Sequence, residues 1–265
     1  ENFLAAAQQD KWYNALFWLI LSGVALGAGV AALFASQSRG GWLGFAGGAL
    51  IVILLKGGKW TAIAATGLIA GAILISMGAL ALLPASILER FIDILPFITL
   101  PDISAIPLTD ANFATIERLA HWQSARAMWR DHLWLGVGFG NYEAIYAAYS
   151  LGRWIEPLGH AHNYILNIGA EAGLVGALGY FFFWIWAILL TVRAIKHTQT
   201  GTLYRAIIIG SLGIFAHLHI HNLFDNLYVQ GMYLHLSIIF ALITLIEKQG
   251  NYTNVKRLYR FEQSK

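Results

Sequence analysis

The chain has 265 residues, of which 58% are hydrophobic and only 12% are charged, and its formal net charge is +3. Soluble domains carry about twice that share of charged residues, so the composition excludes an ordinary soluble globular domain. Cysteine is absent, which excludes disulfides and thiolate metal sites. The chain begins with Glu1 and shows no signal peptide, so we expect a fragment or a processed product.

Long apolar runs predict an all-α, polytopic membrane helix bundle. The runs at 15–35, 60–83 and 207–218 hold almost no charge and are rich in glycine and alanine. A helix that crosses a bilayer needs about 20 such residues. We therefore expect six spans, at roughly 14–35, 41–55, 60–83, 163–190, 204–221 and 227–246.

These spans divide the chain into four parts. Three transmembrane helices occupy 1–83 and three more occupy 163–247. Residues 84–161 form a segment too long for a linker, and we expect a structured outer loop with its own helices, one of them amphipathic. Residues 248–265 form a basic tail.

Basic residues predict the orientation, because cytoplasmic loops retain more positive charge than translocated ones. With both ends of the chain in the cytoplasm, eleven basic residues, including all seven lysines, lie inside. The six outside are all arginines: Arg39, Arg90, Arg118, Arg126, Arg130 and Arg153. Arginine binds phosphate and carboxylate oxygens bidentately. The bias indicates an anionic ligand on the outer face, with lipid headgroups as the alternative.

Two segments of the expected outer face contain four of these arginines. In SQSRGGW, at 36–42, Arg39 lies between the first two spans, where it indicates either a functional site or an interface anchor. Between 111 and 134, four side chains recur at every fourth residue and predict one basic, aromatic stripe on a helix: Arg118, Trp122, Arg126 and Arg130. Such a helix either lies among anionic lipids or presents arginines to a phosphate-bearing ligand.

Two further motifs follow this helix. The run GVGFGN, at 136–141, follows no strand, so it predicts a tight loop rather than a dinucleotide site. In HAHNYILNIGAEAGLVGALG, at 160–179, His162 or Asn163 can cap the following helix, and Glu171 lies within a span. A neutral histidine can take a proton from a hydroxyl, so His162 is a candidate general base, with a structural histidine as the alternative. His160 is a candidate supporting residue of the same site, and the sequence gives it no specific role.

A second histidine group ends the fifth span on the same outer side. His217 and His221 are four residues apart, a spacing that zinc sites use. No third ligand of a known pattern accompanies them, and Asn222 and Asp225 follow. We expect these residues to be polar helix ends rather than a metal site, and to contact the same cavity on the outer face as the arginines and His162.

The motifs together resemble the O-antigen ligase and polymerase superfamily of bacterial inner membranes, over about residues 36–190. The ligase signature is a histidine and a small polar residue, then nine residues, glycine, two residues and glycine. His162, Asn163, Gly173 and Gly176 fit it. The other matching elements are the S-R-G of 38–40, the R-x-x-x-W of 118–122 and the glycine-rich turn. The chain departs from the family where Leu133 replaces a common proline. Family members usually have about twice as many spans, so we expect this chain to correspond to the C-terminal half of their fold.

The resemblance implies a membrane glycosyltransferase that works on the periplasmic face. It would move a glycan from an undecaprenyl diphosphate carrier to a lipid or glycan acceptor hydroxyl, without a metal ion or other cofactor and without a nucleic-acid partner. His162 would deprotonate or orient the acceptor. Arg39 and Arg118 would hold the diphosphate with help from Arg126, and Asn163 and Glu171 would have supporting roles.

The resemblance leaves two alternatives. A polymerase of the same superfamily would use a second carrier-linked repeat as the acceptor. Bicarbonate-transporter-like members share the SRGGW junction, and the outer arginines would then serve an anion path. Transporters place ionisable residues near the bilayer midplane, whereas the expected spans are almost bare of charge, which favours chemistry at the surface.

Overall fold

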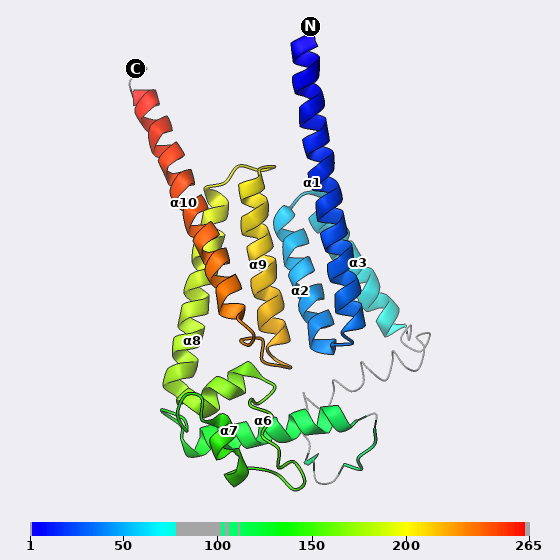
Figure 1. Cartoon of the computed structure of the whole chain (residues 1–265), viewed down its shortest axis with the longest axis vertical. Coiled ribbons are helices and arrows are strands. Elements are labelled where there is room, and N and C mark those ends of the chain that lie inside the picture. Colours follow the sequence, from blue (N-terminus) through cyan, green and yellow to red (C-terminus); the bar gives the residue numbers. More distant parts are fainter. Residues whose placement is uncertain (1, 78–101, 104–105, 111, 263–265) are drawn as a thin grey trace.

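The computed structural model describes residues 2–77, 102–103, 106–110 and 112–262. Its elements in chain order are α1 (Asn2–Ala35), α2 (Arg39–Lys56), α3 (Lys59–Ser76), α6 (Phe113–Asp131), α7 (Tyr142–Ile145), the 3-10 helix η3 (Tyr146–Ala148), α8 (Tyr164–Lys196), α9 (Leu203–His221) and α10 (Met232–Glu262) (Figure 1). These ranges contain no β-strand, so the all-α prediction is confirmed.

Five helices of the described ranges are long and apolar enough to cross a membrane: Tyr13–Ala35, Arg39–Lys56, Tyr164–Lys196, Leu203–His221 and Met232–Gln249. They coincide with five of the six expected spans, and the chain is a polytopic helical membrane protein. Helix α3 covers the remaining expected span as far as Ser76, and residues 78–83 lie outside the described part. Helix α10 begins at Met232, later than the expected 227, and continues as a helix into the predicted tail.

Helix α6 lies across one end of the bundle (Figure 1). The turn between α1 and α2 and the loop between α9 and α10 lie at this same end, whereas both termini lie at the other. Helices α6 and α7 therefore confirm, for the described residues, that the segment between the third and fourth spans carries its own helices. Residues 84–101 of that segment lie outside the described part.

Helices α2 and α9 approach each other so closely that their backbones touch. The contact runs along glycines spaced four residues apart on α2: Gly40, Gly44 and Gly48. A Cβ atom on Gly48 would lie 2.6 Å from the carbonyl oxygen of Gly213. Small residues permit such an approach between membrane helices. Because Arg39 begins α2, this contact sets its first turn beside the end of α9.

Helix α8 is broken at Gly173, where the sequence predicts a continuous span. The residue has φ 64° and ψ −160°, a backbone region open almost only to glycine. The segment before the break lies across the end of the bundle, and the segment after it runs along the other candidate membrane spans (Figure 1). The sequence pattern does not reveal this break, because the residues on both sides of it are apolar and each side forms a helix.

The loop after α6 compensates for the hydrogen bonds that the break removes. Four backbone pairs join it to α8: Leu174 N to Leu133 O at 2.8 Å, Val175 N to Trp134 O at 3.2 Å, Val137 N to Ala170 O at 2.8 Å and Gly138 N to Glu171 O at 2.9 Å. Gly136, with φ 68°, leaves no room for a side chain, since a Cβ atom would lie 2.4 Å from the carbonyl carbon of Glu171. The glycine-rich run is thus a tight loop, as predicted.

Substitution of Gly173 by alanine is expected to destabilise the protein. The left-handed backbone costs a non-glycine residue about 1–3 kcal/mol, and the new Cβ atom would lie 2.4 Å from the carbonyl carbon of Trp134. Thermal unfolding in detergent, followed by circular dichroism, should show a lower midpoint for Gly173→Ala. The matched control is Gly179→Ala on the same helix, where no atom lies within 4 Å of the new Cβ. Equal midpoints for the two variants would contradict the assigned role of the break.

Candidate active site

A cavity of about 340 Å³ lies where α6 meets the ends of the membrane helices. Its wall comes from three parts of the chain: the start of α2 with the turn before it (36–43), the first turns of α6 (114–118) and the end of α9 with the loop that follows (221–225). Residues far apart in sequence are therefore gathered at one end of the bundle.

Arg39 and Arg118 both line this cavity and are half-buried. Arg39 donates a hydrogen bond from Nη1 to Oγ1 of Thr115 on α6 at 3.4 Å. Ser38 caps α2, and its Oγ accepts from the backbone N–H of Gly41 at 3.1 Å. The positive end of the α2 dipole and two guanidinium groups thus meet at one cavity, which suits an anionic ligand.

The other two arginines of the predicted stripe lie elsewhere. Each four-residue step along an α-helix overshoots a full turn by about 40°, so a stripe at this spacing drifts round the helix. Arg126 is exposed and lies outside the cavity wall, and Arg130 pairs with Asp131 at 2.9 Å on the surface. This placement differs from the expectation that Arg126 shares the anion site.

Two side chains hold the backbone of His162 in an unusual conformation. His162 has φ 51°, and such a left-handed backbone costs a non-glycine residue about 1–3 kcal/mol. Its N–H donates to Nδ1 of His160 at 3.1 Å, and its carbonyl accepts from Nε1 of Trp122 at 3.0 Å. His160, which the sequence leaves without a role, and Trp122 of the R-x-x-x-W motif both position His162.

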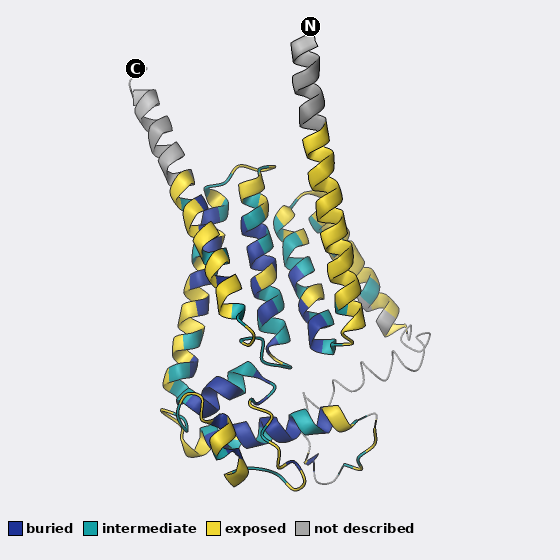
Figure 2. Ribbon diagram, viewed as in Figure 1, coloured by how far each residue is buried: buried dark blue, intermediate teal, exposed yellow. Residues whose placement is uncertain are grey.

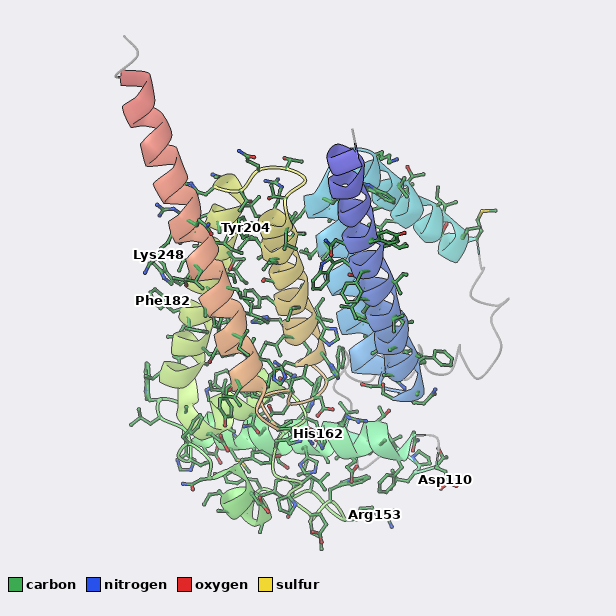
Figure 3. The ribbon with its side chains drawn as sticks, turned by 45° about the horizontal axis from the view of Figure 1, so that its top comes forward. Asp110, Arg153, His162, Phe182, Tyr204 and Lys248 are labelled. Atoms are coloured by element: carbon green, nitrogen blue, oxygen red, sulfur yellow. The ribbon has the colours of Figure 1, made fainter. Side chains whose placement is uncertain are left out.

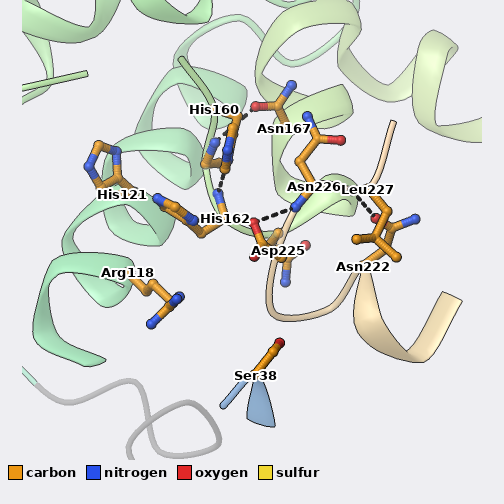
Figure 4. Close-up of polar contacts among 12 residues, drawn as sticks. Ser38, Arg118, His121, His160, His162, Asn167, Asn222, Asp225, Asn226 and Leu227 are labelled. Carbon is orange, nitrogen blue, oxygen red and sulfur yellow. Dashed lines mark hydrogen bonds and ion pairs between the residues drawn. The ribbon is translucent and has the colours of Figure 1, made fainter. Parts of the chain in front are cut away.

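Asp225 lies beside the imidazole of His162. Nδ1 of His162 is 3.4 Å from Oδ1 of Asp225, an ion-pair distance (Figure 4). Burial alone would raise the pKa of the Asp225 carboxyl, but hydrogen bonds from His162 and from the backbone N–H of Asn226, with the charges of His162 and His160, lower it to about 2. Asp225 is thus ionised at neutral pH and places a carboxylate beside the imidazole of His162.

The other nitrogen of His162, Nε2, is buried and has no hydrogen-bond partner among the described residues. Buried polar atoms of this kind nearly always have a partner, so an unpaired one calls for an explanation. A ligand that binds next to Nε2 would supply this partner.

A third histidine, His121 of α6, packs against this site. Its ring centroid lies 5.5 Å from that of His162, and its Nδ1 lies 3.0 Å from the hydroxyl oxygen of Tyr142. Burial, followed by the nearby charges of His162 and His160, lowers the pKa of His121 to about 4. His121 is therefore neutral at physiological pH.

The start of α8 is tied to the loop that carries Asp225. Asn163 is the N-cap, because its Oδ1 accepts from the backbone N–H of Leu166 at 3.1 Å, which decides between the two expected caps. Its Nδ2 donates to the carbonyl of Leu223 at 3.0 Å, and the backbone N–H of Tyr164 donates to the carbonyl of Asn222 at 2.9 Å. These bonds hold the α9–α10 loop against the helix that follows His162.

Glu171 is buried, with 7% of its surface exposed, and lies outside the cavity wall. Its Oε1 accepts from the backbone N–H of Tyr142 at 3.1 Å, at the first residue of α7. The carboxylate thus satisfies an amide at a helix start, which fits a supporting role.

The three histidines near the end of α9 lie in different surroundings. His221 lines the cavity, with Nε2 3.3 Å from Oγ of Ser38. His217 packs against Gly44 on α2, and His219 bonds the carbonyl of Phe215 at 2.7 Å. The expected contact with the outer cavity therefore holds for His221 and for Asp225, which follows the group.

Among the residues that the structure describes, one cluster could hold a metal ion. His160, His162 and Asp225 each offer a ligand atom, and the three atoms lie within 4.8 Å of one another. Two imidazoles and a carboxylate suit zinc and related divalent ions. The sequence leads us to expect no metal here. Treatment with a chelator therefore tests whether an ion at these three residues is required.

The O-antigen ligase family model matches residues 23–181. Comparison with proteins of curated function finds no match. The family match extends from α1 to the middle of α8 and thus includes both cavity arginines, Trp122 and the histidine held by it. Because it covers more than half of the chain, the protein belongs to the O-antigen ligase family.

Proposed function

We propose that this protein moves a glycan from a polyprenyl diphosphate carrier, of the undecaprenyl type, to a hydroxyl group of a lipid or glycan acceptor. The observation that carries the proposal is the juxtaposition of two groups. One is His162, which is unpaired at Nε2 and lies outside the cavity wall, 3.4 Å from Asp225 in that wall. The other is the cavity itself, lined by Arg39 and Arg118. Such a transfer needs a general base for the acceptor hydroxyl and a binding site for the diphosphate.

In the proposed reaction, the acceptor oxygen forms a bond to the anomeric carbon while the bond from that carbon to the carrier's phosphate oxygen breaks. The acceptor proton passes to Nε2 of His162, and the diphosphate leaves with the electron pair of the broken bond. Asp225 stabilises the imidazolium that results, and Arg39 and Arg118 stabilise the charge that develops on the diphosphate. A single displacement of this kind inverts the anomeric centre.

The site end of the bundle is proposed to face the periplasm, in the inner membrane of a bacterium. The cavity, α6 and the α9–α10 loop all lie at this end. Both termini lie at the opposite end, which carries the lysines at Lys56, Lys59 and Lys196. The excess of positive charge there supports a cytoplasmic location for the termini.

A reconstituted transfer assay tests the function. The purified protein in liposomes receives a glycan on undecaprenyl diphosphate and either a lipid-linked core acceptor or only the carrier-linked repeat. Product on the core acceptor supports a ligase, and chain growth on the carrier supports a polymerase. Absence of both products together with bicarbonate uptake into the liposomes would replace the proposal with anion transport. Prior treatment with a chelator, without loss of transfer, would exclude a required ion at His160, His162 and Asp225.

A further inference from the structure

We propose that the loop from Leu133 to Phe139, here called the 133–139 loop, inserts into the outer leaflet of the membrane and fixes the depth of the active site. The loop exposes four large apolar side chains: Leu133, Trp134, Leu135 and Phe139. The exposed fraction reaches 72% for Leu135 and 78% for Phe139. A cluster of this kind in a water-facing loop would be costly, and such clusters mark membrane or partner contacts.

The hydrogen bonds of the loop place it at the membrane boundary. Its carbonyls at Leu133 and Trp134 accept from the backbone N–H groups of Leu174 and Val175, which open the membrane-crossing part of α8. The loop is therefore level with the first turn of a transmembrane segment.

The apolar surface of the loop continues onto the side of α8 that faces lipid. Val175, Leu178 and Phe182 are all exposed on this helix, and Phe182 projects from the outer side of the bundle (Figure 3). Figure 2 shows the exposed residues running along α8. Because lipid is what surrounds a transmembrane helix, the bilayer is the occupant that this continuous surface fits.

Charged side chains lie just before the loop. Arg126, Arg130 and Asp131 are exposed at the end of α6. Basic residues next to an apolar insertion fit the headgroup layer, where arginine contacts lipid phosphates. Aromatic Trp134 also suits this boundary.

Insertion of the loop would also set the height of His162 relative to the bilayer, a consequence that rests on the proposed function. The segment Tyr164–Ala172 of α8 begins directly after His162 and ends at the break that the loop holds. A loop anchored in lipid would keep this segment at the membrane surface. His162 and the arginine cavity would then stay at the level where a lipid carrier presents its diphosphate. The loop's insertion can be measured without any assumption about the reaction.

Single-cysteine labelling tests the proposal, and the absence of cysteine from the chain makes the experiment clean. Leu135→Cys and Phe139→Cys are labelled with an environment-sensitive fluorophore and reconstituted in phosphatidylcholine liposomes. Leu178→Cys on α8 is the lipid-exposed control. Glu143→Cys on α7, which lies on the side of α6 away from the bundle, is the water-exposed control. Quenching is measured with spin-labelled phosphatidylcholine and with iodide.

We expect labels at 135 and 139 to be quenched by the spin-labelled lipid to an extent comparable with the label at 178, and several times more than the label at 143. Quenching by iodide instead, with normal lipid quenching at 178, would overturn the proposal. Protection from both quenchers would also overturn it, because protein, such as a second copy of the chain, would then cover the loop.

Discussion

Replacement of His162 by alanine is expected to lower the rate of glycan transfer by about 10²–10⁴-fold, the usual contribution of a general base. The imidazole is the group whose Nε2 is buried without a partner and whose Nδ1 faces Asp225. Its loss removes the proton acceptor but leaves both cavity arginines in place. Initial rates of transfer in the reconstituted assay measure the effect, and the affinity for the donor should change little.

The control for this substitution is His235→Ala, which removes an exposed histidine at the start of α10. That variant should transfer glycan at the rate of the unmodified protein. Transfer by His162→Ala within a few-fold of His235→Ala would refute the role of His162 as the base.

The Asp225→Asn variant tests whether Asp225 acts through His162. If Asp225 acts by stabilising the imidazolium of His162, its replacement slows transfer in the parent protein but has no further effect once His162 is alanine. Groups that act as a unit show this lack of additivity. Independent, multiplicative losses would mean that Asp225 serves the reaction in some other way.

Much of the candidate site can be located in the sequence because its residues fall in short motifs with fixed spacing. Arg39 precedes two glycines, Arg118 and Trp122 are one turn apart, and His162 is followed by Gly173 and Gly176. The structure explains these spacings physically. One turn of α6 sets an arginine in the cavity and a tryptophan on the carbonyl of His162, and Gly173 breaks α8 so that its first part can lie across the bundle.

The contribution of Asp225 could not be predicted in the same way. It follows His162 by two membrane-crossing segments, and its position depends on hydrogen bonds from Asn163 and Tyr164 to the α9–α10 loop. The approach of α2 to α9 through their glycines brings Arg39 to the same place. Both are tertiary effects, since no local propensity specifies which helix ends meet. The positive φ of His162 is likewise set by its two partners and not by its own sequence.

Arg118→Ala and Arg126→Ala form a matched pair on one helix, and their effects are expected to differ widely. Arg118 lines the cavity, whereas Arg126, two turns further along α6, is exposed outside it. Removal of one preorganised group that stabilises a developing charge costs about 10²–10³-fold in rate. We expect a loss of that size for Arg118→Ala and near-normal transfer for Arg126→Ala, measured as kcat/KM for the diphosphate-linked donor.

The lysine variant of Arg118 separates charge from geometry. Lysine keeps the positive charge but lacks the planar fork that binds two phosphate oxygens at once. Arg118→Lys should therefore recover only part of the activity, and Arg126→Lys should leave it unchanged. Equal losses for Arg118→Ala and Arg126→Ala would instead mean that the basic stripe acts as a whole, through attraction of the helix to anionic lipid. Such attraction is screened by salt, so the losses of both variants would then shrink together as the ionic strength rises.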